Sequence, residues 1–340
     1  VKLTDLIKKL DYNGTRPTLF IDRSDKFKTP LIGVFTLIFF LIGAASFIYF
    51  GRELIEHQKP DVSFAQEYTP IPEDYVIDFN NYNIMVDIQD PTWQNYYNDS
   101  IYRIEAKHNR LYSNGSLFQD DLPLVPCTED LFGDDNRQLY RSTQTKNNWC
   151  IDRTKVRNIT IKGTFNNPEY YFITWYVNSC KNDSSNINNP CAPQDVIDSY
   201  LNGGFISMRT IDNLIDTKNY TNPYFKILSE YYFSLSNKYF KEIVMYYKNS
   251  DIISDEGIVF ESLSSQRFLQ LEHIKENFDF RVPESNFIQL VIRMHTTKEI
   301  INRRYIKVQS IIANVGGILK FFAIYLSIMT EVYGKHKYYE

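Results

Sequence analysis

Few side chains in this chain of 340 residues have the spacing that catalysis requires. The sequence contains no GxGxxG loop, no Walker phosphate loop, no GxSxG nucleophile turn and no HExxH zinc motif. The five histidines are scattered, and none lies beside a cysteine in a nucleophile-like setting; they are His57, His108, His273, His295 and His336. We therefore expect a protein that is not an enzyme, with no catalytic residues and no cofactor.

One group of carboxylates has a spacing that could bind a cation. Glu129, Asp130, Asp134 and Asp135 lie within EDLFGDDN, residues 129–136. Closely spaced carboxylates can bind calcium, but this spacing differs from that of an EF-hand loop. Zinc is not expected either, because the sequence contains no CxxC pair. We expect a solvated acidic loop and no metal site.

All four cysteines lie in the middle of the chain, at Cys127, Cys150, Cys180 and Cys191. An even number of cysteines is typical of disulfides in an oxidising compartment. Three connectivities are possible, and the simplest joins neighbours: Cys127 to Cys150 and Cys180 to Cys191. Four free thiols are the alternative.

The same region contains five sequons, the acceptor motifs for N-glycosylation. Their asparagines are Asn98, Asn114, Asn158, Asn182 and Asn219, and one more sequon, at Asn13, lies close to the start of the chain. Sequons are used only in the secretory pathway, so these motifs favour an exported, glycosylated middle region.

A largely apolar block lies near each end of the sequence. The first, residues 29–51, reads TPLIGVFTLIFFLIGAASFIYFG and is long enough to cross a bilayer as a helix. A helix that is apolar on every face is rarely the core helix of a soluble protein. The alternative is a signal peptide cleaved near Gly43-Ala44-Ala45. Apolar residues continue through Phe50, which favours a span.

The second block, residues 308–333, includes SIIANVGGILKFFAIYLSIMTEVY and predicts another transmembrane helix. Basic residues precede the first block and follow the second, so the positive-inside rule places both ends in the cytosol, or in the matrix of a mitochondrion. The expected organisation is a basic tail at 1–28, a helix at 29–51, an exported domain at 52–307, a helix at 308–333 and a tail at 334–340.

Each predicted span has one face of small or polar residues, spaced by steps of three and four. The residues of these faces are Gly33, Thr36 and Gly43 in the first span, and Ala313, Gly317, Lys320 and Ser327 in the second. In lipid, small residues allow helices to approach closely and polar groups find partners across the contact. We expect intramembrane contacts here, either between the two spans or with another subunit.

Lys320 lies near the centre of the second span, where insertion of a lysine costs about 2.5–3.5 kcal/mol. The first span contains no carboxylate that could offset this cost. One explanation is that the side chain extends to the headgroups. The other is an acidic or carbonyl partner on another polypeptide.

Between the spans, apolar and polar residues alternate with a period of two, and β-branched and aromatic residues dominate. We expect strands at 81–88, 101–108, 158–165, 169–177, 240–248, 257–264 and 286–296. One short helix is expected in PQDVIDSYLNGG, between Pro193 and the stop signal Gly203-Gly204. The predicted fold class is a membrane protein whose two transmembrane helices flank a β-rich, sandwich-like ectodomain with disulfides and one short helix.

Four stretches resemble a large group of uncharacterised ciliate two-span transmembrane proteins. They are FKTPLIGVFTL (27–37); PLVPCTEDLF (123–132) with NNWCID (147–152) and IKGTF (161–165); the second cysteine pair with CAPQDVIDSYL (191–201); and RRYIKVQSIIANVGGILK (303–320). The resemblance implies a membrane-anchored lumenal or extracellular domain and no known activity.

A weaker resemblance is to the two-span cargo receptors that cycle between endoplasmic reticulum and Golgi. It rests on LIKKLDYNG (6–14), the threonine before the first span and ANVGG (313–317) at the second. That family has a β-rich lumenal domain, so the resemblance implies one here. The final KHKYYE contains no clear retrieval signal.

These features favour a structural, assembly or recognition subunit of a membrane complex, which binds protein through its β-rich domain. Three alternatives are a two-span trimeric ligand-gated cation channel, an accessory subunit of a mitochondrial inner-membrane complex, and an ER–Golgi cargo receptor. The expected partners are the lipid bilayer and another membrane protein subunit, identical or different. Nucleic acid is not expected, since the net charge is -4. The expected location is a membrane of the secretory pathway, the plasma or ciliary membrane, or the mitochondrial inner membrane.

Overall fold

The computed structural model describes residues 30–57, 59–78, 80–142, 147–181, 190–280 and 286–339. It divides the chain into two compact units. One is a helical unit, made of the residues up to His57 and those from Ile306 onward. The other, residues 58–305, is called the β-body below.

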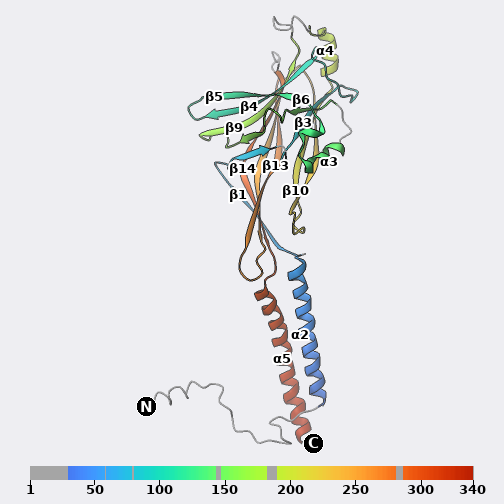
Figure 1. The fold of residues 1–340 in the computed structure, drawn as a ribbon, viewed down its shortest axis with the longest axis vertical. Coiled ribbons are helices and arrows are strands. Elements are labelled where there is room, and N and C mark those ends of the chain that lie inside the picture. The colour runs from blue at the N-terminus through green and yellow to red at the C-terminus, as the bar shows by residue number, and fades with distance from the viewer. Residues whose placement is uncertain are drawn as a thin grey trace. The chain divides into compact units, whose positions relative to one another are not determined.

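The helical unit contains α2 (Pro30–Glu56) and α5 (Val308–Tyr339), which lie side by side (Figure 1). Gly33–Glu56 and Val308–Met329 are long and apolar enough to cross a membrane. None of the first segment and only 11% of the second is buried by protein. Both helices continue beyond the predicted ends at residues 51 and 333. The helical unit therefore leaves large apolar surfaces uncovered.

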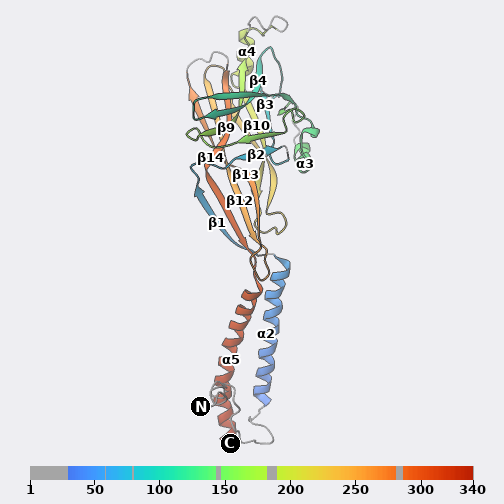
Figure 2. The same ribbon diagram turned by 60° about the vertical axis from the view of Figure 1, so that its left-hand side comes forward.

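The larger sheet of the β-body is built around one long strand, β14 (Asn286–Arg304). Its strand order is β13-β12-β14-β9-β4-β5, and β1 pairs with the second half of β14 (Figure 2). The pairing of β12 with β14 is parallel, and the other pairs are antiparallel. The other strands are β1 (Asp61–Tyr68), β4 (Tyr102–Tyr112), β5 (Leu117–Leu122), β9 (Glu169–Ser179), β12 (Phe240–Asp255) and β13 (Leu263–Asp279).

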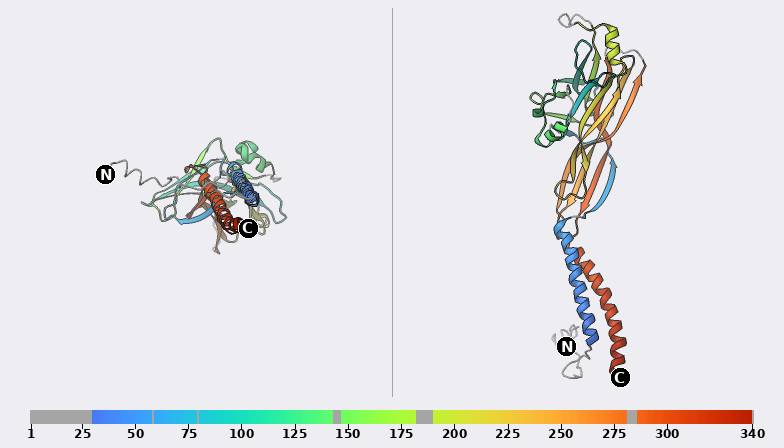
Figure 3. Two further views of the ribbon diagram at one scale, coloured as in Figure 1. Left: turned by 90° about the horizontal axis from the view of Figure 1, so that it is seen from below. Right: turned by 90° about the vertical axis from the view of Figure 1, so that its right-hand side faces the viewer.

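A second sheet has the order β11-β10-β3-β7-β6, and a separate pair joins β2 to β8. The strands are β2 (Tyr75–Asp78), β3 (Ile84–Gln89), β6 (Leu124–Pro126), β7 (Trp149–Ile151), β8 (Asn158–Ile161), β10 (Phe205–Ile215) and β11 (Tyr224–Ser234). Short helices lie outside the sheets: η1 (Glu129–Leu131), α3 (Asp134–Ser142) and α4 (Gln194–Leu201). In Figure 3, α3 lies at the side of the β-body.

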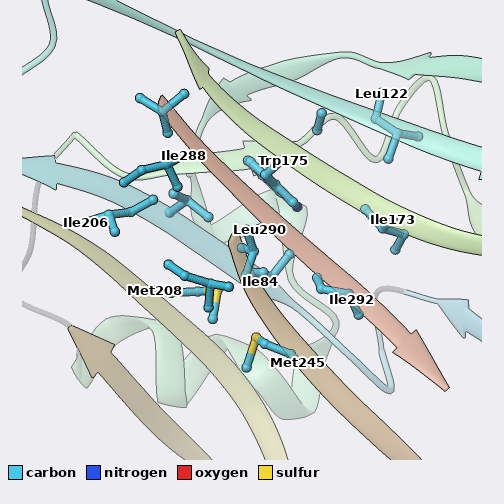
Figure 4. Close-up of a cluster of buried hydrophobic side chains, with 14 of the residues drawn as sticks. Ile84, Leu122, Ile173, Trp175, Ile206, Met208, Met245, Ile288, Leu290 and Ile292 are labelled. Carbon is cyan, nitrogen blue, oxygen red and sulfur yellow. The ribbon is translucent and has the colours of Figure 1, made fainter. Parts of the chain in front are cut away.

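The two larger sheets share one hydrophobic cluster (Figure 4). It includes Ile84, Ile206 and Met208 from the smaller sheet and Ile173, Trp175, Met245, Leu290 and Ile292 from the larger one. Every second residue of these strands points into the cluster because successive side chains of a strand alternate between the two faces of a sheet. This alternation is the pattern that predicted the strands. Burial of apolar surface between the sheets is what stabilises the β-body.

Two local predictions were wrong. Residues 257–262 form the turn of the β12–β13 hairpin rather than a strand, and Asp255 holds this turn by accepting the N–H groups of Gly257 and Ser262. A Cβ at Gly257 would lie 1.7 Å from the Phe260 carbonyl oxygen, so only glycine fits this turn. The acidic segment is not a loop either. It forms η1 and the first turn of α3, where carboxylates interact favourably with the helix dipole.

The shared cluster predicts how much a cavity in the core lowers the stability of the β-body. Ile292 is fully buried, and Ile292→Ala should lower the free energy of unfolding by about 2–5 kcal/mol. Ile71→Ala is the control, because Ile71 is exposed and its truncation should cost no more than about 0.5 kcal/mol. Urea unfolding followed by tryptophan fluorescence measures both. Equal effects of the two substitutions would contradict the described core.

Candidate functional site

The two apolar helices contact each other through only part of the predicted small-residue faces. A Cβ at Gly43 would lie 3.0 Å from Cδ2 of Leu319, so this glycine lets α5 approach α2 closely. Along α5, the least exposed positions are the apolar Ile311 and Val315, which lie on the same side as Leu319. The contact between the helices therefore uses the apolar side of α5.

The small and polar face of α5 points away from this contact. Ala313, Gly317, Lys320 and Ser327 are all exposed in the described chain. A Cβ at Gly33 or Gly317 would meet no described atom within 4 Å. No ion-pair partner of Lys320 is found among the residues that the structure describes. Only Gly43 of the predicted contact glycines thus faces the other helix.

The structure contains two disulfides, Cys127–Cys150 and Cys180–Cys191, which is the neighbour pairing. The first disulfide closes the segment that contains η1 and α3. In this segment, Leu131, Phe132 and Cys150 pack on Met85 and Ile211, which belong to the smaller sheet. The disulfide thus holds a cover over the face of the smaller sheet opposite the shared cluster.

The sequon asparagines of the β-body are accessible wherever the structure describes them. Asn98, Asn114, Asn158 and Asn219 are exposed, and Asn182 lies outside the described residues. Within the described ranges no group of three or more His, Cys, Asp or Glu side chains could hold a metal ion. Glu129 instead accepts a hydrogen bond from Arg141 at 2.9 Å, and this bond lowers the pKa of its carboxyl group.

The sequence did not indicate a row of cationic and aromatic side chains on the larger sheet. The Arg293 guanidinium lies 5.1 Å from the Tyr170 ring and 5.0 Å from the Tyr246 ring. His273 stacks on Tyr246 at 4.5 Å, and His295 lies 5.1 Å from His273. These residues come from β9, β14, β12 and β13, and we call them the Arg293 row. The scattered histidines of the sequence thus include two that the sheet brings together.

Burial and neighbouring positive charges shift the pKa values of groups in and beside the Arg293 row. Burial lowers the pKa of His295, and the neighbouring His273 lowers it further. The Lys248 ammonium lies between Glu272 at 2.7 Å and Glu299 at 3.1 Å, beside the histidines. The pKa of the Glu272 carboxyl is lowered because Lys248 and the two histidines outweigh the effect of its burial.

A buried ion pair lies on the covered face of the smaller sheet. The Arg209 guanidinium donates to Asp87 at 3.2 Å, to Asn148 at 3.2 Å and to Glu230 at 2.8 Å. Arg209 and Asp87 are both buried, so each needs the other to offset its desolvation. In the pairing of β10 with β3, the residue opposite Arg209 is Met85. The contact between Arg209 and Asp87 is therefore diagonal between the two strands. Register of this kind cannot be obtained from local sequence.

A polar groove of about 640 Å³ lies beside β4, β5 and β7. Tyr97 and Trp149 form its aromatic part, with ring centroids 4.6 Å apart, and Asp99, Arg103 and Lys107 also line it. The Trp149 indole N–H is buried and has no acceptor among the described residues. The groove therefore combines an aromatic surface with both signs of charge.

These observations define a class of protein: a β-rich body with two disulfides, attached to a pair of apolar terminal helices long enough to cross a membrane. Residues 74–295, well over half of the chain, match the family described as "Uncharacterised 80 kDa protein N-terminal domain". The chain belongs to this family. The resemblance to ciliate two-span proteins stays a prediction. No match to a curated protein was found.

Three solved structures have a limited likeness to the chain. A proton-activated chloride channel is 12% identical, with a TM-score of 0.30, over 89% of this chain and 97% of that one. Erv41p is 8% identical, with a TM-score of 0.29, over 71% and 99%. A chicken ATP-gated P2X7 receptor channel is 8% identical, with a TM-score of 0.15, over 89% and 99%. TM-scores of this size do not establish a shared fold.

The lowered pKa values of His295 and His108 predict that acid destabilises the β-body. Burial lowers the pKa of His108, although its Nε2–H donates to the Thr160 carbonyl at 2.8 Å. The unfolded chain therefore binds more protons than the native chain as the pH falls through about 6.5. Stability should be full well above that pH and should decrease as the pH falls through it, until the lowered pKa values of the native histidines are reached. Carboxylates with lowered pKa values, such as Glu272, lose their contribution only at lower pH.

His295→Gln tests this dependence. The variant should lose less stability than the parent chain between about pH 7.5 and 5.5, as measured by urea unfolding at each pH. His57→Gln, at the end of α2 and outside the β-body, is the control and should behave like the parent. An identical pH profile for parent and His295→Gln would show that His295 does not titrate as the Arg293 row implies.

Proposed function

We propose that the chain is a non-enzymatic, two-span membrane protein and that it serves as an assembly or recognition subunit of a membrane complex. The observation that carries the proposal is the exposed apolar surface of α2 and α5. None of the first candidate span and only 11% of the second is buried by protein. Apolar helices of this length are stable in a hydrocarbon layer, where their backbone groups are satisfied internally.

The distribution of charges and cysteines supports one orientation. Basic residues precede the first span and follow the second, so both ends face the cytosol. The β-body then lies on the exported side, where its two disulfides persist. The four accessible sequons agree with this side. We further propose that the β-body is a two-sheet sandwich, because its two larger sheets share one hydrophobic cluster.

Assembly is proposed to use the small and polar face of α5. The two helices already contact each other through Gly43 and Leu319, which leaves Gly317 and Lys320 available to another membrane helix. A polar group within lipid is stabilised when it finds a partner on a neighbouring helix. Recognition is proposed to use the groove lined by Tyr97, Arg103 and Trp149, which presents aromatic and charged side chains together.

The orientation can be tested by enzymatic deglycosylation. Full-length chain expressed in eukaryotic cells should migrate faster after treatment with peptide-N-glycosidase, because its exposed sequons carry glycans. The control is a chain in which all five predicted sites are changed to Gln; these are Asn98, Asn114, Asn158, Asn182 and Asn219. This variant should show no change in mobility. An unchanged mobility of the parent chain would argue against the secretory route and in favour of the mitochondrial inner membrane.

The assembly face can be tested at Lys320. Lys320→Leu removes the polar contact and should weaken the complex by about 1–2 kcal/mol, which is about tenfold in the dissociation constant. Lys320→Arg keeps the charge and should retain the complex. Phe321→Leu is the control, because Phe321 is exposed but lies on a different side of α5 from Lys320. Native gel electrophoresis of membranes in mild detergent, together with surface expression, measures the result. Unchanged assembly and surface expression of Lys320→Leu would favour a side chain that only extends to the headgroups.

A further inference from the structure

The turn of the β12–β13 hairpin exposes a cluster of large apolar side chains. Ile258 is 55%, Phe260 84% and Leu263 65% exposed, and Val259 lies between the first two. We call residues 256–263 the apolar tip. Hydrogen bonds hold its backbone in a closed turn: the Glu256 N–H donates to the Ser262 carbonyl at 2.9 Å, and Asp255 accepts from Gly257 and Ser262. The apolar tip is therefore a defined turn with its side chains directed away from the shared core.

The strand pairing locates the apolar tip at one particular end of the larger sheet. β12 runs parallel to β14, and their last residues, Asp255 and Arg304, are partners. The Tyr305 N–H donates to the Asp255 carbonyl at 3.4 Å, so the base of the tip is bonded to the chain that leads into α5. Val308, the first residue of α5, is three residues further on, a distance of at most about 11 Å.

The first helix is connected to the same end of the sheet. Arg304 is also the partner of Asp61, the first residue of β1. The last residue of α2, Glu56, precedes Asp61 by five residues, a reach of at most about 18 Å. The chain thus enters or leaves both candidate spans within a few residues of the base of the apolar tip. This follows from the strand register and the chain length alone.

We propose that the apolar tip inserts into the surface of the lipid bilayer that the two helices cross. This inference rests on the proposed function, because it takes α2 and α5 to be membrane spans. Both spans begin or end at the level of the headgroups, and the tip is tied to the strands that lead to them. An exposed cluster of Ile, Val, Phe and Leu in that position removes its apolar surface from water by entering the interface.

The charged groups around the apolar tip agree with a shallow insertion. Glu256 and Glu261 flank the apolar residues, and the Asp255 carboxylate is turned into the loop. Carboxylates remain in the hydrated headgroup layer, so the tip should enter an electrically neutral lipid surface to the depth of its side chains. The partner is therefore the lipid itself, and phosphatidylcholine is a suitable probe.

The opposite end of the same strand provides a matched control. Phe280 follows β13 directly and is 82% exposed, almost the same fraction as Phe260. The 17 residues of β13 separate these two ends by about 55 Å. All four cysteines of the chain are in disulfides, so a cysteine introduced at either position is the single free thiol.

The experiment measures the depth of a nitroxide label in full-length chain reconstituted in phosphatidylcholine vesicles. Labels are placed at Phe260→Cys, at Ile258→Cys as a second position in the tip, and at Phe280→Cys as the control. A label at Ile324→Cys, on an exposed position of α5, reports on the span. The ratio of collision rates with oxygen and with a water-soluble nickel chelate should be several-fold higher for both tip labels than for Phe280→Cys.

Each of the other results of this experiment would contradict a specific statement. If the tip labels behave like Phe280→Cys while Ile324→Cys is in lipid, the tip does not insert and the proposed function still holds. If Ile324→Cys is also in water, the proposed spans are wrong and the inference fails with them. If the tip labels are immobilised and shielded from both reagents, the tip is covered by protein and the lipid assignment is wrong.

Discussion

The arrangement of this protein depends on the hydrogen bonding of β14. This strand pairs in parallel with β12, antiparallel with β9 through its first half, and antiparallel with β1 through its second half. Its last residue, Arg304, lies between Asp61 and Asp255, and α5 begins four residues later. Because β1 follows α2 and β14 precedes α5, the chain enters and leaves the larger sheet at the same end.

The helices and the β-body are stabilised by different interactions. In the β-body, apolar side chains of two sheets share one cluster, and burial of apolar surface provides the driving force. Among the residues that the structure describes, the helices have no such cover. Their apolar surfaces remain largely exposed, and their own contact depends on the close approach that Gly43 allows to Leu319. The chain thus combines a β-body that has its own hydrophobic core with helices whose apolar surfaces are left uncovered.

Charge in the β-body is placed where neighbouring strands can compensate it. Arg209 is buried but is bonded to Asp87, Asn148 and Glu230. Arg293 lies between two tyrosine rings, and Lys248 lies between two glutamates. In each case at least two of the partners come from neighbouring strands, so the compensation forms only when the sheet has the correct register. These polar contacts therefore favour one strand register over others, which the hydrophobic pattern alone does not do.

The sequence by itself determined the features that depend on local pattern. The two apolar blocks, the short helix near Pro193, six of the fourteen described strands and the even set of cysteines follow from composition and period, which a chain displays before it folds. Tertiary structure decided what depends on neighbours distant in sequence. Residues 257–262 became a turn because β12 and β13 pair on either side of them, and the acidic segment became helical because a disulfide and the smaller sheet hold it. The meeting of His273 with His295, and the direction of Gly317 and Lys320 away from α2, likewise depend on how strands and helices pack. The period of the sequence identifies which residues share one face of a helix or strand. Only tertiary packing determines which other residues that face contacts.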